Sequence, residues 1–228
     1  MKKLVTLFLI VFPVSLFAQI DPVGAFNRYV VENWSGQFQR IGNYKVKGSP
    51  FLLGGAMPGE IKHQGGVMVK NQKILYNLHE QIVGPDMNGA VFQADQVIEE
   101  FVLYFPAEYS GEKAHFVNAS RYEAPKGTAA YVQVMSEGKA VSLLKGYRIK
   151  IVPDPTNMMD KEFRLFEQYT EYYLFDAASK TFTKVKISKK DFATALKATP
   201  ALQDKVKSYS GNVETMQDAR VLVDMLNL

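Results

Sequence analysis

Three histidines, His63, His79 and His115, are the side chains in this sequence best suited to bind a transition metal. A zinc site needs three or four ligands that converge on one point. His63 and His79 fall in different expected strands, at a spacing that does not pair them as ligands, and His115 is distant from both. We therefore predict no metal-binding residue among the histidines.

Two acidic segments have a composition that could bind calcium. Residues 86–89 (Asp-Met-Asn-Gly) begin like a calcium loop, but Val97 stands at the twelfth position, where such a loop is closed by a glutamate. Asp154, Asn157 and Asp160 form a second, looser set. Asp, Asn and Gly are also the residues that turns require, so turn formation explains both segments without a cation.

The sequence contains serines and glutamates, which can serve as nucleophiles or as acids and bases, but they do not form a known catalytic motif. Ser49 precedes a proline and Ser110 precedes a glycine, so both are typical of turns and neither lies in a Gly-x-Ser-x-Gly elbow. Glu99 and Glu100 are adjacent in an expected strand, so we expect their side chains on opposite faces. The chain has no cysteine, which excludes thiol catalysis. We predict no catalytic and no cofactor-binding residue, with an active site assembled from distant residues as the alternative.

Aromatic residues are concentrated in one expected strand. Alternation places Tyr169, Tyr173 and Phe175 on one face, and Tyr172 and Leu174 on the other. Exposed tyrosines of exported β proteins can stack on sugars or contact partners, whereas buried ones belong to the core. We favour core packing and leave the exposure of this strand open.

These residues must be positioned mainly by strands, which the pattern places between about residues 37 and 187. Two hairpins are predicted, one joining 131–135 to 141–151 and the other joining 163–175 to 181–187. Residues 98–105 form an aromatic and β-branched run that is typical of a central strand buried on both faces.

Glycine-rich segments and helix signals complete the pattern. By composition, residues 54–59 are expected to form a loop and residues 84–89 a turn. A short N-terminal helix is predicted to begin at Asp21 and to end near Trp34.

At about residue 188 the spacing of apolar residues changes from every 2 positions, which is typical of a strand, to every 3.6 positions, which is typical of a helix. Ser188 with Asp191 resembles a capping box, Thr199-Pro200 starts a second helix, and a third runs from about residue 213. We predict an α+β fold in which β structure dominates, with an antiparallel sheet or partly open barrel, the N-terminal helix and about three C-terminal helices in residues 188–228.

The first residues have the features of a removable secretion signal. Lys2 and Lys3 precede an apolar run over residues 4–16, and Ala18 offers a cleavage position that would leave Gln19 first. The run is shorter than the roughly 20 apolar residues of a membrane span, and a lipid anchor would need a cysteine. We expect a signal peptide at 1–18, one soluble domain at 19–228, and a periplasmic or extracellular location.

Charge gives little indication of a partner. The chain carries 27 Lys and Arg against 23 Asp and Glu, and removing the signal leaves 25 basic residues, so the net charge falls to about +2. A nucleic-acid surface needs a clustered basic face. The densest lysine cluster, at residues 184–190, is typical of a solvated surface. We expect no nucleic-acid partner and no transmembrane segment in the mature chain, and an envelope protein or a glycan as the class of partner.

Several segments together resemble a family of exported proteins common in Bacteroidetes-type bacteria. They share turn glycines, strand aromatics and a lysine-flanked helical tail, at residues 17–19, 48–52, 58–59, 75–78, 137–139 with 141–144, 172–174 and 189–226. The resemblance covers most of the mature chain but consists of structural motifs, and it implies no activity, cofactor or catalytic residue.

The expected function follows from export and from the lack of a catalytic motif. We expect a non-catalytic binding or structural module of the cell envelope. A hydrolase with a dispersed active site and a small-lipid carrier are the alternatives. The sequence does not identify a ligand or an oligomeric state.

Overall fold

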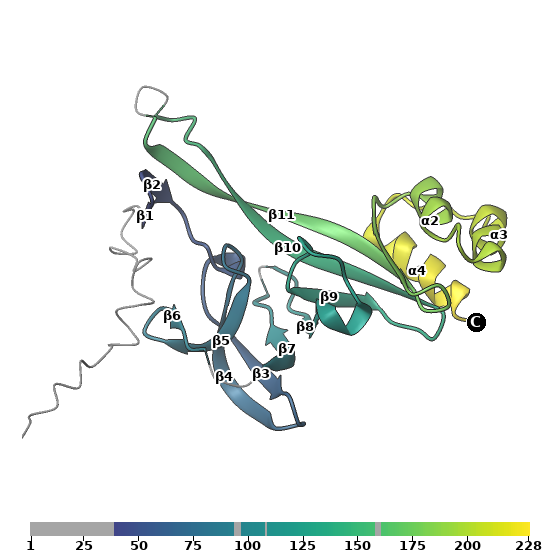
Figure 1. Cartoon of the computed structure of the whole chain (residues 1–228), viewed down its shortest axis with the longest axis horizontal. Helices are drawn as coiled ribbons and strands as arrows, with labels where there is room; N and C mark the ends of the chain where they lie inside the picture. Colours follow the sequence, from purple (N-terminus) through teal and green to yellow (C-terminus); the bar gives the residue numbers. More distant parts are fainter. Residues whose placement is uncertain (1–38, 94–96, 108, 158–160) are drawn as a thin grey trace, which may run out of the picture.

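A curled, mostly antiparallel sheet forms the main part of the molecule (Figure 1). The computed structural model describes residues 39–93, 97–107, 109–157 and 161–228. The predicted signal at 1–18 and the helix expected at 21–34 lie outside the described residues.

The described part of the chain contains twelve strands in one sheet, in the order β1-β2-β11-β10-β9-β8-β7-β3-β4-β5-β6, with β12 also pairing with β11. Among these described strands, β2 and β11 are the one pair that runs parallel. The strands are β1 (Gln39–Ile41), β2 (Tyr44–Lys47), β3 (Met57–His63), β4 (Met68–Asn77), β5 (Ile82–Met87), β6 (Ala90–Val91), β7 (Ile98–Tyr104), β8 (Lys113–Asn118), β9 (Tyr131–Ser136), β10 (Val141–Pro153), β11 (Phe163–Asp176) and β12 (Thr181–Val185).

Both predicted hairpins are confirmed. The β9–β10 hairpin leads into the β10–β11 hairpin, which is the longest feature in Figure 1 and has the C-terminal helices at one end. The other expected hairpin is β11–β12, which pairs Tyr172 with Val185 and Asp176 with Thr181. The fold is α+β with β dominant, as predicted.

The two glycine-rich predictions are only partly right. Strand β3 already begins at Met57, so half of residues 54–59 are strand, and strand β5 continues through Gly84 to Met87, so most of residues 84–89 are strand. A Cβ on Gly59 would lie 2.1 Å from the Val102 carbonyl oxygen, and one on Gly84 would lie 2.1 Å from that of Phe92. These glycines permit a close approach of backbones, which composition alone does not distinguish from a turn.

The inner face of the sheet carries two apolar clusters. In the ring cluster, Tyr76 of β4 packs edge-on against Phe101, Phe116 and Tyr131 of β7, β8 and β9. Because β4 and β9 are not neighbours in the sheet, these contacts require the sheet to curl. Tyr147 of β10 belongs to the same cluster.

The second inner cluster, the helical cluster, joins the sheet to α2 (Lys189–Ala195), α3 (Pro200–Ser208) and α4 (Met216–Leu226). The Ser188 side chain caps α2 by accepting from the Asp191 N–H, but the Asp191 carboxylate accepts from Lys186 and does not return to Ser188. The reciprocal capping box is at α4, between Thr215 and Asp218. The three predicted C-terminal helices are confirmed.

The outer face carries a third cluster beneath the short 3-10 helix η3 (Ala119–Tyr122). Another 3-10 helix in the described part of the chain, η2, spans Leu52–Gly54. Tyr173 lies in this outer cluster and Leu174 in the helical cluster, and both are buried. Tyr169 is 37% exposed. The aromatic strand is therefore core at its C-terminal end and partly exposed near its middle.

Candidate functional site

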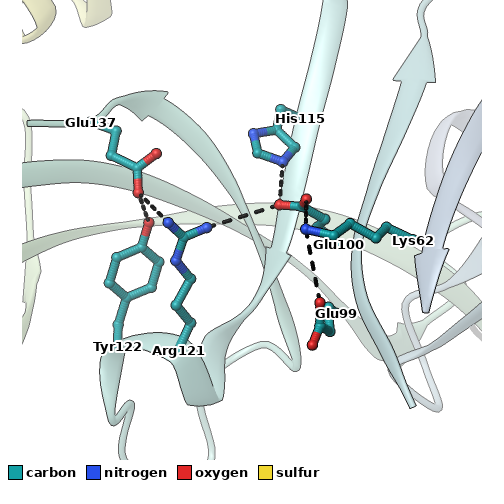
Figure 2. A network of polar contacts seen from close by, with 7 residues as sticks. All are labelled: Lys62, Glu99, Glu100, His115, Arg121, Tyr122 and Glu137. Carbon is teal, nitrogen blue, oxygen red and sulfur yellow. Dashed lines mark hydrogen bonds and ion pairs between the residues drawn. The ribbon is translucent and has the colours of Figure 1, made fainter. Parts of the chain in front are cut away.

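The outer face carries a network of polar side chains beside η3 (Figure 2). Figure 2 shows side chains from β3, β7 and β8 facing others from η3 and from the loop after β9: Lys62, Glu99, Glu100, His115, Arg121, Tyr122 and Glu137. Strand β7 was predicted to be buried on both faces. That prediction is wrong, because the outer face of β7 carries Glu100 and the exposed Tyr104.

Glu100 is the centre of the network. Its Oε1 accepts a hydrogen bond from Lys62 Nζ at 2.8 Å, and its Oε2 lies 3.1 Å from His115 Nε2 and 3.9 Å from Arg121 Nη1. Strand register explains the contacts, since Lys62 is directly opposite Glu100 in the β3–β7 pair. The hydrogen bond from Lys62, followed by that from His115, holds the pKa of Glu100 below its usual range despite partial burial.

A register shift between β3 and β7 brings Glu99 close to the Lys62 ammonium group, which also contacts Glu100. Lys62 pairs with Glu100, but the next residue, His63, pairs with Ile98, so Glu99 is the extra residue of a bulge. Glu99 Oε2 then lies 3.9 Å from Lys62 Nζ. The prediction that the two glutamates point to opposite faces is wrong, because strict alternation fails at a bulge.

Helix η3 supplies the other half of the network. Asn118 accepts from the Ser120 N–H at 3.0 Å and so fixes the start of η3. Arg121 Nη2 lies 3.2 Å from Glu137 Oε1, and the Tyr122 hydroxyl donates to the same oxygen at 3.1 Å. Burial raises the pKa of Tyr122 and the Glu137 carboxylate raises it further, so this hydroxyl keeps its proton and remains a donor.

The network can present alternating charges, but it is poorly suited to acid–base chemistry. A catalytic acid needs a carboxyl pKa raised toward neutrality, whereas that of Glu100 is lowered. Both oxygens of Glu100 already contact cationic or donor groups. Arg121 is 52% exposed and Glu99 is 44% exposed, so these charges can reach a partner.

The three histidines that were candidate metal ligands lie in different surroundings in the structure. His63 is the last residue of β3 and is 9% exposed, and its Nδ1 has no hydrogen-bond partner among the described residues. His79 lies against the Phe166 ring with centroids 5.9 Å apart, and only His115 joins the network. Within the described ranges, no three His, Cys, Asp or Glu side chains are grouped to hold a metal ion.

The two acidic segments form turn contacts. Asp86 Oδ1 accepts a hydrogen bond at 2.7 Å from the Gly89 N–H, three residues further on, and so closes the turn. Asp154 accepts from Lys47 and Thr156. Asp160 lies outside the described residues.

Sequence reasoning missed Lys62, Arg121, Tyr122 and Glu137. The available signal was weak: charged residues stand at single positions within apolar strands, as Lys62 does after Ile61. Such positions are usual on any half-exposed sheet. Only the strand order 8-7-3 and the placement of η3 bring these residues together.

No protein-family model, no curated protein and no solved structure matches the chain. The resemblance to an exported family therefore stays a prediction. Among the helices described, none is both long and apolar enough to cross a membrane.

Proposed function

We propose that the protein is an exported, non-catalytic binding module of the cell envelope, and that the network around Glu100 is part of its contact surface. Export is proposed from the charged start, apolar run and small residue of the first 18 positions. The resemblance to exported proteins of Bacteroidetes-type bacteria supports the same location, periplasmic or extracellular.

The main support for the proposal is that the Glu100 carboxylate is ionised and already paired with cationic or donor groups. It is neutralised by Lys62, with His115 and Arg121 beside it, while the outer members of the network stay exposed. Fixed charges of both signs at a surface favour selective, salt-sensitive recognition of a complementary partner. An envelope protein or a glycan provides such a partner.

The packing of the ring cluster favours this function over a lipid carrier. The rings of Phe101 and Phe116 stack with centroids 4.7 Å apart, and Tyr76 meets both edge-on. These rings occupy the inside of the curl, where a carrier would need an apolar cavity for its ligand.

A matched pair of variants tests the contact surface. Glu99→Gln with Arg121→Gln removes one charge of each sign from the network, and leaves Glu100 with its Lys62 and His115 contacts. Asp204→Asn with Lys207→Gln likewise removes one charge of each sign, from an exposed ion pair on α3. Circular dichroism and thermal unfolding establish that both variants fold.

The assay is capture from envelope fractions with a tagged chain that starts at Gln19, followed by titration of the identified partner. We expect the network variant to bind about tenfold more weakly, and binding to the wild type to weaken as salt increases. Equal affinity of the network variant and the α3 control would contradict the assignment of the surface.

The hydrolase alternative requires a separate measurement. Purified wild type and Glu100→Gln are assayed on ester, glycoside and peptide substrates. We expect no turnover by either. Turnover by the wild type that Glu100→Gln abolishes would identify an enzyme and overturn the proposal.

Export is tested at the first residues. Replacing Lys2, Lys3 and the apolar run by polar residues should retain the protein in the cytoplasm, and N-terminal sequencing of the exported wild type should begin at Gln19. Export of the altered chain at wild-type levels would contradict the predicted signal.

A further inference from the structure

A row of polar side chains separates the two apolar clusters of the inner face. Lys145 of β10 is directly opposite Gln133 of β9 on one side and Tyr172 of β11 on the other. Directly opposite residues share a face with Cβ atoms about 5 Å apart, so these three side chains are immediate neighbours. The ring cluster lies on one side of the row and the helical cluster on the other.

Lys145 lacks the partner that a partly buried ammonium normally has. Across the described ranges Lys145 makes no hydrogen bond or ion pair, and its Nζ lies over the Tyr147 ring, 4.7 Å from the centroid. Burial lowers the pKa of this ammonium. Partial loss of water is costly for an ammonium, so a ligand of opposite charge would stabilise Lys145.

The two residues opposite Lys145, Gln133 and Tyr172, offer hydrogen-bond donors and carry no negative charge. Gln133 is 8% exposed, and its Oε1 accepts from the Tyr147 hydroxyl at 2.8 Å. Its amide nitrogen has no acceptor among the described residues, and neither does the Tyr172 hydroxyl. An ammonium, an amide N–H and a phenol are thus available together.

We propose that this row binds the carboxylate of an organic ligand. One ammonium matches the single negative charge of a carboxylate, whereas a phosphate dianion would remain half uncompensated in a partly buried site. The amide of Gln133 and the hydroxyl of Tyr172 supply further donors to the two carboxylate oxygens. The tyrosine rings beside them favour a ligand with a planar or apolar body.

This site is independent of the proposed contact surface, since the row and the Glu100 network lie on opposite faces of the sheet. A carboxylate can come from a small organic acid or from the C-terminus of a peptide. Both present the same group to Lys145, and the experiment distinguishes them.

The test compares probes on the full mature chain. Benzoate, its neutral analogue benzamide, inorganic phosphate, and an N-acetylated dipeptide with a free or amidated C-terminus are titrated by NMR. Lys145→Met removes the ammonium while keeping an extended side chain. Lys150→Met is the matched control, because Lys150 lies on the same strand but pairs with Glu167 on the outer face.

We expect the wild type and Lys150→Met to bind benzoate or the free dipeptide, and Lys145→Met to bind about tenfold or more weakly. Binding should raise the Lys145 pKa, followed through its Cε and Nζ resonances, because a carboxylate favours the charged form. A preference for the dipeptide assigns the ligand to a chain terminus, and a preference for benzoate assigns it to a small acid.

Three results would overturn the proposal: no binding of either carboxylate, equal binding by Lys145→Met, or equal binding of the neutral analogues. Stronger binding of phosphate than of both carboxylates would overturn the ligand class. If Lys145→Met does not fold, Lys145→Gln takes its place, and the Lys145 pKa in the wild type remains an independent readout.

Discussion

Asp154 is a buried carboxylate that fastens strand β2 to the end of the β10–β11 hairpin. One oxygen accepts from Lys47 Nζ at 2.8 Å, and the other accepts from the N–H and hydroxyl of Thr156 at 2.9 and 2.7 Å. These bonds, that of Lys47 first, lower the pKa of Asp154 to about 2. The acidic segment that begins at Asp154 has a composition that could bind calcium, but its first carboxylate forms a turn and an ion pair with Lys47.

Asp154→Asn should reduce the acid sensitivity of folding. The folded pKa of about 2 lies below the value of 3.8 for an unperturbed aspartate, so the unfolded chain takes up its proton first. Stability from Asp154 is complete above about pH 4 and is lost as the pH falls toward 2. Urea unfolding from pH 2 to 5 should show a smaller loss in Asp154→Asn than in the wild type.

Asp204→Asn, at an exposed carboxylate, is the control for that measurement. It should leave the acid dependence close to that of the wild type. An unchanged pH dependence in Asp154→Asn would mean that the ion pair with Lys47 does not stabilise the fold.

Gly59 decides how closely β3 approaches β7. An added Cβ would lie 2.1 Å from the Val102 carbonyl oxygen and 2.6 Å from Ile74 Cδ1, and backbone cannot move aside as a flexible side chain can. We expect Gly59→Ala to lower the free energy of unfolding by about 3 kcal/mol. Gly65→Ala, which meets no atom within 4 Å but has a positive φ, should cost only about 1 kcal/mol. Denaturant unfolding compares the two, and an equal cost would contradict the steric explanation.

At the scale of elements, Asn227 joins the end of α4 to the start of β10. Its Oδ1 accepts from the N–H groups of Ala140 and Val141, and its Nδ2 donates to the carbonyls of Val141 and Val223. One side chain thereby satisfies four backbone groups at the junction of helix and sheet.

Asn227→Ala should lower the free energy of unfolding by about 2 to 3 kcal/mol, because the partly buried backbone groups lose their partners. Gln217→Ala, at an exposed position of the same helix, should change it by less than about 0.5 kcal/mol. Urea unfolding measures both, and a negligible effect of Asn227→Ala would show that water replaces the side chain at this junction.

At the scale of the whole molecule, the three C-terminal helices complete the core of the sheet. The longest, α4, has 11 residues, and isolated helices of that length are marginal in water. Their stability comes from the helical cluster, where fully buried residues such as Leu143, Phe192 and Leu222 pack together. Sheet and helices therefore depend on each other.

Removal of residues 189–228 should abolish cooperative unfolding and expose the helix-facing side of β10 and β11. Increased binding of a hydrophobic dye and aggregation in size-exclusion chromatography are the expected results. Removal of Leu228 alone, which is fully exposed, should leave both measurements unchanged. A stable, monomeric product from the larger deletion would show that the sheet folds independently.

The hairpins, the starts of α2 and α3 and the dominance of β structure could be predicted from the amino-acid sequence. These features depend on residues close in the chain: alternation through β10 and β11, Ser188 at the start of α2, and Pro200 at the start of α3. Local periodicity and capping are readable without knowledge of the fold.

Which side chains meet depends on contacts between strands that are distant in the chain. The bulge at Glu99, the order of β8, β7 and β3, and the position of η3 assemble the network around Glu100. The row through Gln133, Lys145 and Tyr172 likewise depends on the registers of three strands. A shift of one residue in a strand moves every side chain to the other face, and the register is set by packing over the whole sheet. For that reason neither site could be assigned from the sequence alone.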